Sequence, residues 1–371
     1  MRKATTNCLI VLALTASIAS VVAEEQVLLI GTNAREQGIY ASSLNLESGE
    51  FAPANAVGDA PRPSFLALHP RLPLLYAVTQ EQSEPAGGVR AFRIDSNGIG
   101  LELIDRESTG DEGSTHLEVC PNGEAIIVAN YTGGSTTLLP LDGDGKLGPL
   151  SSLIQHQGAS VNQQRQRAPH AHGVAIDHDG NFACVADLGT DEVIVYRIVG
   201  GSGLARVSAW DAKPGAGPRH LTFHPHGRWL YSINELDSTL TVLSFDRQTG
   251  TLTELQTIDT LPADFQSPNT TAEVVVHPSG RYVYISNRGH DSTAAFAIDG
   301  ETGRLRLIEI EPTQGGHPRF IGIDPSGKFL IAANRDANNL VSFGIDPQTG
   351  GLKPTGYQVS VPQPVCVVFP Q

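Results

Sequence analysis

The chain repeats one β-hairpin pattern six times, and this repeat restricts its fold more than any other feature. Each copy is a short alternating strand, a four-residue turn usually of the Pro-x-Gly kind, and a second strand richer in aliphatic and aromatic residues. The copies are FLALHPRLPLLYAVTQ (65–80), HLEVCPNGEAIIVANY (116–131), GVAIDHDGNFACVADL (173–188), HLTFHPHGRWLYSINE (220–235), EVVVHPSGRYVYISNR (273–288) and FIGIDPSGKFLIAANR (320–335). They recur about every 50 residues, which is typical of β-propeller blades, whereas a β-sandwich requires no such period.

A second pair of strands follows most hairpins, as in LTVLSFDRQTGTLTEL (240–255) and AAFAIDGETGRLRLI (294–308), so each repeat contains four strands. A seventh copy is split: PVCVVFP (364–370) supplies an inner strand and QVLLIGTN (26–33) the matching second strand. Pairing these two segments closes the ring and leaves no open sheet edge. The sequence therefore predicts an all-β, seven-bladed propeller closed by joining the N- and C-terminal strands in one blade, with residues 24–371 forming a single domain.

Residues 1–23 have the features of a secretory signal peptide. Arg2 and Lys3 precede an apolar run, and small residues follow at the cleavage offsets. No later stretch approaches the roughly 18 consecutive apolar residues that a membrane helix needs. We therefore expect a periplasmic or secreted protein that has no membrane partner once the signal peptide is removed.

Charge and cysteine content narrow the classes of partner. The chain has 25 Lys and Arg against 39 Asp and Glu, so its surface should repel nucleic acid and anionic lipid. Cys8 lies in the predicted signal peptide, and Cys120, Cys184 and Cys366 lie in apolar, strand-like stretches, where we expect buried thiols rather than a disulfide framework or a metal site. A small molecule is the expected partner, and the sequence leaves the oligomeric state open.

Propeller geometry brings together residues that are distant in the chain. The start of a first strand and the end of a second strand lie at the same mouth of the central channel, so Arg219, His220, Asn234 and Glu235 should surround one opening. Equivalent positions in other blades add His172, Glu273, Arg288, Arg319 and Arg335. Any one of these arginines could instead pair with an aspartate between blades.

Two long polar segments, 156–172 and 259–273, lead to the same mouth. Connections of this length in a compact domain are commonly functional lids or disordered. His170 and His172 are spaced like metal ligands on a strand, but no third ligand accompanies them, so a zinc site is not expected.

Several segments taken together carry a family resemblance. They are VANYTGGS (128–135), HQGASVNQQRQRAPHAHGVAIDHDGNF (156–182), DLGTDEVIVYR (187–197), GAGPRHLTFHP (215–225), INEL (233–236) and SNRGHDS (286–292). In these motifs the chain resembles the seven-bladed β-propeller lactonase family, which includes propeller-type bacterial 6-phosphogluconolactonases and fungal carboxymuconate-lactonizing enzymes. The resemblance implies a cofactor-free lactone site in the channel mouth.

Carried over by motif, the resemblance implies catalytic roles for His172, Arg219, Glu235 and Arg288. The remaining residues expected at the mouth are assigned to substrate binding, and they are His170, His220, Asn234, Glu273, Arg319 and Arg335. Glu235 or His172 could take the proton from an attacking water, with arginines on the oxyanion and on a substrate phosphate or carboxylate. Glu235→Gln should abolish hydrolysis. Because Glu235 is expected to be accessible at the surface, the same change should alter the unfolding free energy by no more than about 1 kcal/mol.

Other functions remain open at this point. The same groups could run ring closure, as in a carboxymuconate-type cyclase, and a propeller could also be a non-enzymatic interaction scaffold. A calcium-dependent, six-bladed gluconolactonase is disfavoured, because arginines occupy the rim where calcium would need oxygen ligands. Since 6-phosphogluconolactone forms inside cells, an exported protein would meet an unphosphorylated aldonolactone or another lactone.

Overall fold

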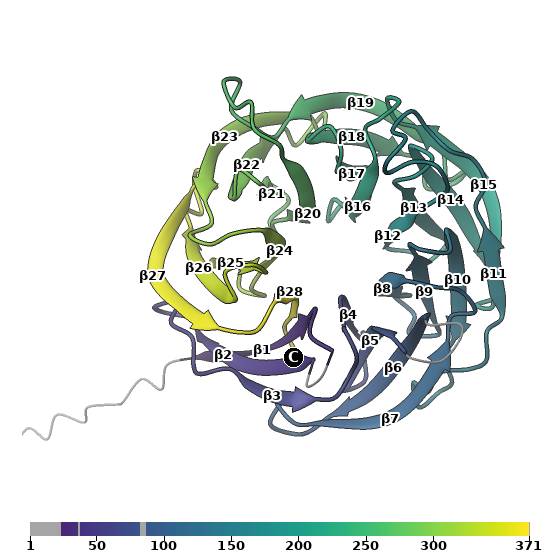
Figure 1. Cartoon of the computed structure of the whole chain (residues 1–371), viewed down its shortest axis with the longest axis horizontal. Helices are drawn as coiled ribbons and strands as arrows, with labels where there is room; N and C mark the ends of the chain where they lie inside the picture. Colours follow the sequence, from purple (N-terminus) through teal and green to yellow (C-terminus); the bar gives the residue numbers. More distant parts are fainter. Residues whose placement is uncertain (1–23, 36–37, 82–86, 371) are drawn as a thin grey trace, which may run out of the picture.

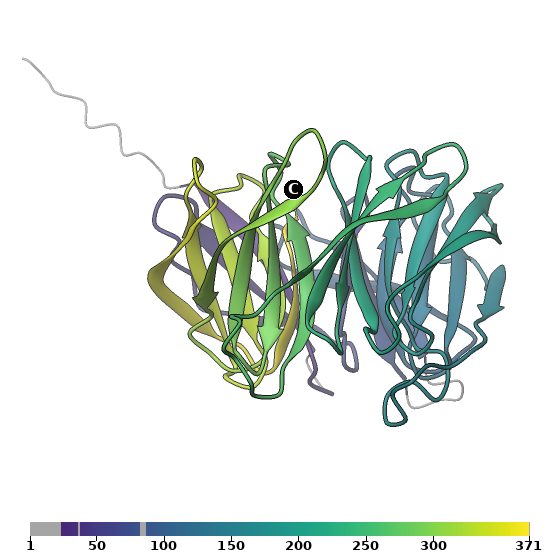
Figure 2. The same cartoon turned by 90° about the horizontal axis from the view of Figure 1, so that it is seen from above.

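The computed structural model describes residues 24–35, 38–81 and 87–370, and it forms a ring of seven four-stranded antiparallel sheets around a central channel (Figure 1). Seen from the side, the sheets stand upright next to one another (Figure 2). The predicted seven-bladed propeller is therefore confirmed. The predicted signal peptide, 1–23, lies outside the described residues, as does Cys8.

Each blade runs outward from the channel through four strands. The innermost strands are β4 (Leu66–Leu68), β8 (Ser114–Val119), β12 (Ala171–Ile176), β16 (Pro218–Phe223), β20 (Thr270–Val276), β24 (Pro318–Ile323) and β28 (Pro364–Val368). The second strands are β5 (Leu74–Gln80), β9 (Ala125–Asn130), β13 (Phe182–Asp187), β17 (Trp229–Asn234), β21 (Tyr282–Arg288), β25 (Phe329–Asn334) and β1 (Glu25–Thr32). The third strands are β6 (Gly87–Ile94), β10 (Ser135–Pro140), β14 (Glu192–Val199), β18 (Thr239–Phe245), β22 (Ser292–Ile298), β26 (Asn339–Ile345) and β2 (Ile39–Asn45). The outermost strands are β7 (Leu101–Ser108), β11 (Ser152–Gln155), β15 (Gly203–Asp211), β19 (Leu252–Asp259), β23 (Leu305–Pro312), β27 (Leu352–Ser360) and β3 (Asn55–Gly58).

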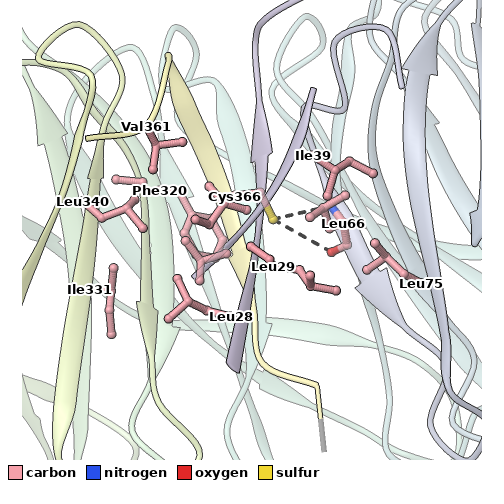
Figure 3. Packing of buried hydrophobic residues seen from close by; sticks show 14 of the residues in the cluster. Leu28, Leu29, Ile39, Leu66, Leu75, Phe320, Ile331, Leu340, Val361 and Cys366 are labelled. Atoms are coloured by element: carbon pink, nitrogen blue, oxygen red, sulfur yellow. Dashed lines mark hydrogen bonds between the residues drawn. The ribbon is translucent and has the colours of Figure 1, made fainter. Parts of the chain in front are cut away.

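The two ends of the chain close the ring in one sheet of order β28-β1-β2-β3, as the split repeat predicts (Figure 1). Leu29 of β1 lies opposite Val368 of β28 in this antiparallel pair. The Cys366 thiol accepts a hydrogen bond from the Leu66 backbone amide at 3.4 Å, in the next blade, and both side chains belong to one buried apolar cluster (Figure 3). The terminal strands are therefore held by ladder hydrogen bonds and by packing against the neighbouring blade.

Burial follows strand position within a blade. The second strands β9, β13, β17 and β25 are buried along their whole length, because neighbouring blades cover both of their faces. This explains why their sequences are almost continuously apolar instead of alternating. Cys120, Cys184 and Cys366 are buried free thiols, as expected. Among the described residues, no helix has the length and apolar character needed to cross a membrane.

The hairpin turns lie on the face of the ring opposite to the starts of the innermost strands, and there they form hydrogen bonds to the turns of the next blade. His224 Nε2 lies 2.8 Å from the carbonyl oxygen of Gly280 in the next blade, and the same contact joins His277 to Gly327 at 2.9 Å. Gly280 has φ +70°, and a β-carbon there would lie 2.7 Å from His224 Nε2. The turn therefore requires glycine both for its backbone conformation and for this close contact.

Candidate active site

A cavity of about 370 Å³ opens at the channel mouth where the innermost strands begin. Its lining comes from several blades because strand starts and second-strand ends meet there. The lining residues are Gln80, Gly113, Thr115, Tyr131, Thr132, Arg165, His172, Glu235, Thr270, Arg288 and Arg319. This volume is within the range that holds a small sugar-sized ligand.

Two hollows of similar volume, about 480 and 460 Å³, lie on the opposite face of the ring, between neighbouring blades. Both are lined by hairpin-turn residues such as His69 and Arg71. His69 is already bonded to the carbonyl oxygen of Gly123 in the next blade. We place the candidate site at the other mouth, because there a buried carboxylate, several guanidiniums and a histidine line one cavity.

Glu235 lies at the centre of the charged groups. One carboxylate oxygen, Oε1, accepts from Arg165 Nη2 at 2.6 Å, and the other, Oε2, contacts Arg219 Nε at 3.0 Å and Arg288 Nη2 at 2.9 Å. Burial by itself would raise the pKa of Glu235, but the guanidiniums of Arg288, Arg219 and Arg165 outweigh burial and hold that pKa well below its usual range. A carboxylate with this pKa stays ionised and is a weak proton acceptor.

The expectation that Glu235 is accessible at the surface is wrong, since the residue is only 4% exposed. The expected small stability effect of Glu235→Gln depended on that accessibility. Removing one partner of a buried ion pair leaves charge without compensation, which costs about 3–5 kcal/mol. Glu235 therefore holds the arginines in place as well as lining the cavity.

Arg319 differs from the other arginines at the mouth. Its guanidinium lines the cavity and, within the described part of the chain, has no hydrogen-bond or ion-pair partner. Burial and the nearby Arg288 lower the pKa of Arg319 to about 10, so the group remains protonated at neutral pH. Four guanidiniums thus surround one Glu235 carboxylate, giving the mouth a local excess of positive charge in a protein of net charge −14.

His172 lines the same cavity from β12. Burial and the neighbouring Arg219 hold the pKa of His172 well below its usual range, so the imidazole is neutral at neutral pH. Its Nδ1 is buried and, within the described structure, has no hydrogen-bond partner. The ring packs edge-on against Tyr131 and His220, with centroid distances of 5.3 and 5.2 Å. Because Nδ1 is buried, the nitrogen that can meet a water in the cavity is Nε2, and a neutral imidazole can accept a proton there.

His220 and Glu273 lie close to His172 but do not line the cavity. His220 Nδ1 lies 2.9 Å from Glu273 Oε1, and both residues are buried. Burial raises the pKa of Glu273 to about 7, although Arg219 opposes this rise. The pair therefore supports the wall behind His172.

Other predicted substrate-binding residues point elsewhere. His170 stacks on Tyr131 at 4.5 Å between centroids, and its Nδ1 lies 2.8 Å from the Tyr131 carbonyl oxygen. Asn234 donates from Nδ2 to Thr239 and Thr241 hydroxyls within its own blade. Arg335 Nε pairs with Asp336 at 2.7 Å. None of the three residues lines the cavity.

Arg165 was not among the expected site residues, although it lines the cavity and contacts Glu235. It lies in the long segment before β12, which the sequence does predict to lead to this mouth. The sequence feature that could have identified Arg165 is an arginine in a polar segment that leads to a charged opening. Among the described residues, no group of three or more His, Cys, Asp or Glu side chains is arranged to hold a metal ion.

A half-buried carboxylate, Glu118 of β8, predicts how stability depends on pH. Its Oε2 accepts from the Ile176 backbone amide at 3.0 Å, and burial raises its pKa to about 8. Between about pH 4.5 and about 8 the unfolded chain releases this proton while the folded chain retains it, so stability should fall as pH rises through this window. Glu118→Gln cannot ionise and should remove up to about 1.4 kcal/mol per pH unit of that fall.

Urea unfolding of the two proteins at several pH values measures this difference. Glu254→Gln, an exposed carboxylate on the outermost strand β19, is the matched control and should leave the slope as in the wild type. Equal slopes for Glu118→Gln and wild type would mean that Glu118 ionises normally in the folded protein.

Comparison with known proteins agrees with this architecture. The family described as "Lactonase, 7-bladed beta-propeller" matches residues 27–369. The chain is 32% identical over 338 residues to a 6-phosphogluconolactonase from Bacillus subtilis, covering 91% of this chain and 96% of the relative. It is 33% identical over 293 residues to a 6-phosphogluconolactonase from Formosa agariphila, covering 77% of this chain and 82% of the relative. The solved structure of a periplasmic gluconolactonase from Pseudomonas aeruginosa superposes with a TM-score of 0.88 at 30% identity, covering 94% of this chain and 99% of the other.

Proposed function

Because this chain belongs to the family of seven-bladed β-propeller lactonases, we propose that it hydrolyses the ring ester of a sugar-acid lactone at the channel mouth. The observation that carries the proposal is one cavity lined by the Glu235 carboxylate, the guanidiniums of Arg165, Arg288 and Arg319, and the neutral imidazole of His172. Arg219, expected to be catalytic, contacts Glu235 but is buried and does not line this cavity. The names of two relatives make a 6-phosphogluconolactonase-like reaction the first activity to test.

In the proposed mechanism His172 is the general base. Water adds to the lactone carbonyl carbon while the imidazole takes one of its protons. Glu235 is less suited to this step, because its pKa is low and both of its oxygens are engaged by arginines. Direct attack by water requires no covalent acyl-enzyme.

Arg288 stabilises the negative charge that the addition creates. It lines the cavity and presents its guanidinium group to the carbonyl oxygen as that atom becomes an oxyanion. When the tetrahedral intermediate collapses, the ring C–O bond breaks and the leaving alkoxide takes the proton back from His172. The product is the open-chain sugar acid, which the lactone forms by taking up one water.

Arg319 is proposed to bind an anionic group on the substrate, because it is the cavity arginine without a protein partner in the described structure. Arg319→Met should raise KM for a phosphorylated lactone about 10- to 100-fold, the loss expected for one charge-assisted hydrogen bond. Its kcat should change much less. Stability should be nearly unchanged, since no ion pair is removed.

Arg335→Met is the matched control for that variant. It removes the same charge from the same rim, but Arg335 pairs with Asp336 and does not line the cavity. Initial rates across a concentration series give KM for both variants. Equal increases in KM for the two variants would assign the effect to the general charge of the rim instead of to Arg319.

The function itself is tested by proton release in a pH-stat. Purified protein is supplied with glucono-δ-lactone and, separately, with 6-phosphogluconolactone generated in the assay, each corrected for spontaneous hydrolysis. Parallel reactions with a metal chelator test the expectation that no cofactor is needed. Rates no higher than the uncatalysed reaction for both lactones would contradict the proposal.

We also propose that the protein acts outside the cytoplasm, in the periplasm or as a secreted protein. The predicted signal peptide supports this location, and the P. aeruginosa relative is named as periplasmic. Fractionation of cells expressing the full chain, with N-terminal sequencing of the product, tests both the export and the cleavage near residue 24. An intact N-terminus on cytoplasmic protein would contradict the proposal.

A further inference from the structure

Arg165 brings a loop into the site. It lies in the segment 156–170 between β11 and β12, and its Nη2 donates to Glu235 Oε1 at 2.6 Å and to the Tyr131 hydroxyl at 3.2 Å. Its side chain is 36% exposed. A half-exposed ion pair on a free loop contributes little, because ordering the long side chain and the loop costs entropy. For Arg165 to define the cavity, the loop must be held in place by other contacts.

The next residue, Gln166, supplies such contacts. It is fully buried at 0% exposure, and its Nε2 donates to Leu188 O at 2.9 Å and to Asp191 Oδ1 at 2.7 Å. Its Oε1 accepts from the Asn162 backbone amide at 3.1 Å. Gln166 is thus a short anchor from the loop into the adjacent blade, while the preceding side chain reaches the cavity.

Asp191 connects this anchor to the other side of the site. It lies at the turn between β13 and β14 with φ +61°, and it is buried. Besides Gln166, its carboxylate accepts from the backbone amides of Gly215 and Gly217, both at 2.7 Å. These glycines immediately precede the strand that carries Arg219. One carboxylate therefore fixes two segments whose arginines both contact Glu235.

In two later blades the residue at the same turn position also accepts a hydrogen bond from a backbone amide but, among the described residues, not from a side-chain amide. Asp291, with φ +54°, accepts from the His317 amide at 2.9 Å, and Asn338, with φ +54°, accepts from the Gln363 amide at 2.9 Å. Within the described structure neither side chain receives a side-chain amide like that of Gln166. In the blade between, Ser238 has φ +58° at this position, and its hydroxyl accepts from Asn269 Nδ2 at 2.9 Å. A side-chain amide is therefore added to the repeated scaffold feature in the two blades where the neighbouring loop residue, Arg165 or Thr270, lines the cavity.

We propose that Gln166 is a positioning residue: by anchoring the loop to Asp191 it holds the Arg165 guanidinium on Glu235 and so sets the anion affinity of the cavity. The inference rests on the proposed function for its substrate, an anionic lactone. Gln166 itself does not line the cavity, so its effect must pass through Arg165.

A double-mutant cycle tests this dependence. The variants are Arg165→Met, Gln166→Met and the double variant, with KM and kcat measured on 6-phosphogluconolactone. We expect each single change to raise KM about tenfold, with kcat changing less, and the double change to be no worse than Arg165→Met alone. Fully additive losses would overturn the proposal, because they would show that the two residues act independently.

Binding of inorganic phosphate, measured by calorimetry on the same four proteins, separates this test from the proposed function. The dissociation constant should rise by a similar factor in all three variants even if the wild type hydrolyses no lactone tested. Unchanged phosphate affinity in Gln166→Met, or no measurable phosphate binding in the wild type, would overturn the positioning role. Amide hydrogen exchange in residues 160–168 should speed up in Gln166→Met, and unaltered protection there would also overturn it.

Ser342→Ala is the control for general loss of a buried hydrogen bond. Ser342 is fully buried in β26, and its hydroxyl donates to Gly49 O at 2.6 Å, away from the cavity. It should leave KM and phosphate affinity unchanged, and a rise equal to that of Gln166→Met would overturn the specific role. Should Gln166→Met not fold, Gln166→Asn keeps an amide with a shorter reach and should shift both constants in the same direction.

Discussion

Glu235→Gln is expected to abolish lactone hydrolysis and to lower the free energy of unfolding by about 3–5 kcal/mol. The carboxylate is buried and contacts Arg165, Arg219 and Arg288 at 2.6–3.0 Å. Among the described residues, Glu235 is the only carboxylate paired with these cations. With a neutral amide in its place the guanidiniums repel one another, and the amide nitrogen faces their N–H donors. Urea unfolding measures the stability loss, and proton release in a pH-stat measures the activity.

Glu192→Gln is the matched control for this change. Glu192 pairs with Arg206 at 2.7 Å on the outer part of a blade, where the arginine side chain is 47% exposed. An exposed pair of this kind contributes about 0–1 kcal/mol. If Glu235→Gln unfolded at the same urea concentration as Glu192→Gln, the three guanidiniums would not depend on Glu235 for their counter-charge.

Loss of activity in Glu235→Gln has an indirect cause in this scheme. Since His172 is the proposed base, Glu235 acts by keeping Arg288 at the cavity wall. Glu235→Asp retains the charge with a shorter reach, so it should recover much of the stability and only part of the activity. Full recovery of stability with no activity at all would instead favour a direct part for the Glu235 carboxylate in proton transfer.

The ring architecture could be predicted from the sequence because it is periodic. Six hairpins and one split copy, with glycine where the turn requires positive φ, leave few alternatives once a closed ring removes every open edge. The pairing of β28 with β1 follows from the same count. Propeller geometry also places strand starts and second-strand ends at one mouth, and this brings His172, Glu235 and Arg288 to one cavity.

Asn234 shows where position alone is insufficient. It ends a second strand at the mouth, yet its amide turns into the blade and donates to the Thr239 hydroxyl at 2.8 Å. The same contact five residues ahead occurs from Asn130 to Ser135, from Asn287 to Ser292 and from Asn334 to Asn339. An asparagine repeated at this position in four blades serves each blade's own scaffold, and that repetition was visible in the aligned hairpins.

Arg165 illustrates the opposite case. Its segment differs in length and sequence from the segment 259–273 that occupies the same place in another repeat, so no alignment between blades could give its conformation. Its place in the cavity depends on tertiary contacts of Gln166 with Leu188 and Asp191. Burial of Glu235 could not be predicted for the same reason, because the loop residue Arg165 is one of the groups that contact it.

His172→Asn is expected to reduce kcat about 10²- to 10⁴-fold, the usual contribution of a positioned general base, with a much smaller change in KM. Asparagine keeps a polar group of similar size but cannot accept the proton. Stability should change by about 1 kcal/mol or less, because Nδ1 of His172 has no partner to lose in the described structure. Steady-state kinetics and urea unfolding measure the two effects separately.

The pH profile of the wild type gives an independent check on the same group. A base acts only while unprotonated, and burial and Arg219 keep the pKa of His172 well below 6.5. Wild-type kcat should therefore stay level as pH falls from neutral and decline only well below 6.5, whereas His172→Asn should lose that decline. His170→Asn changes a histidine of the same motif that stacks on Tyr131 outside the cavity, and it should cost less than about tenfold in kcat. A larger loss in His170→Asn than in His172→Asn would move the proton acceptor from β12 to the loop before it.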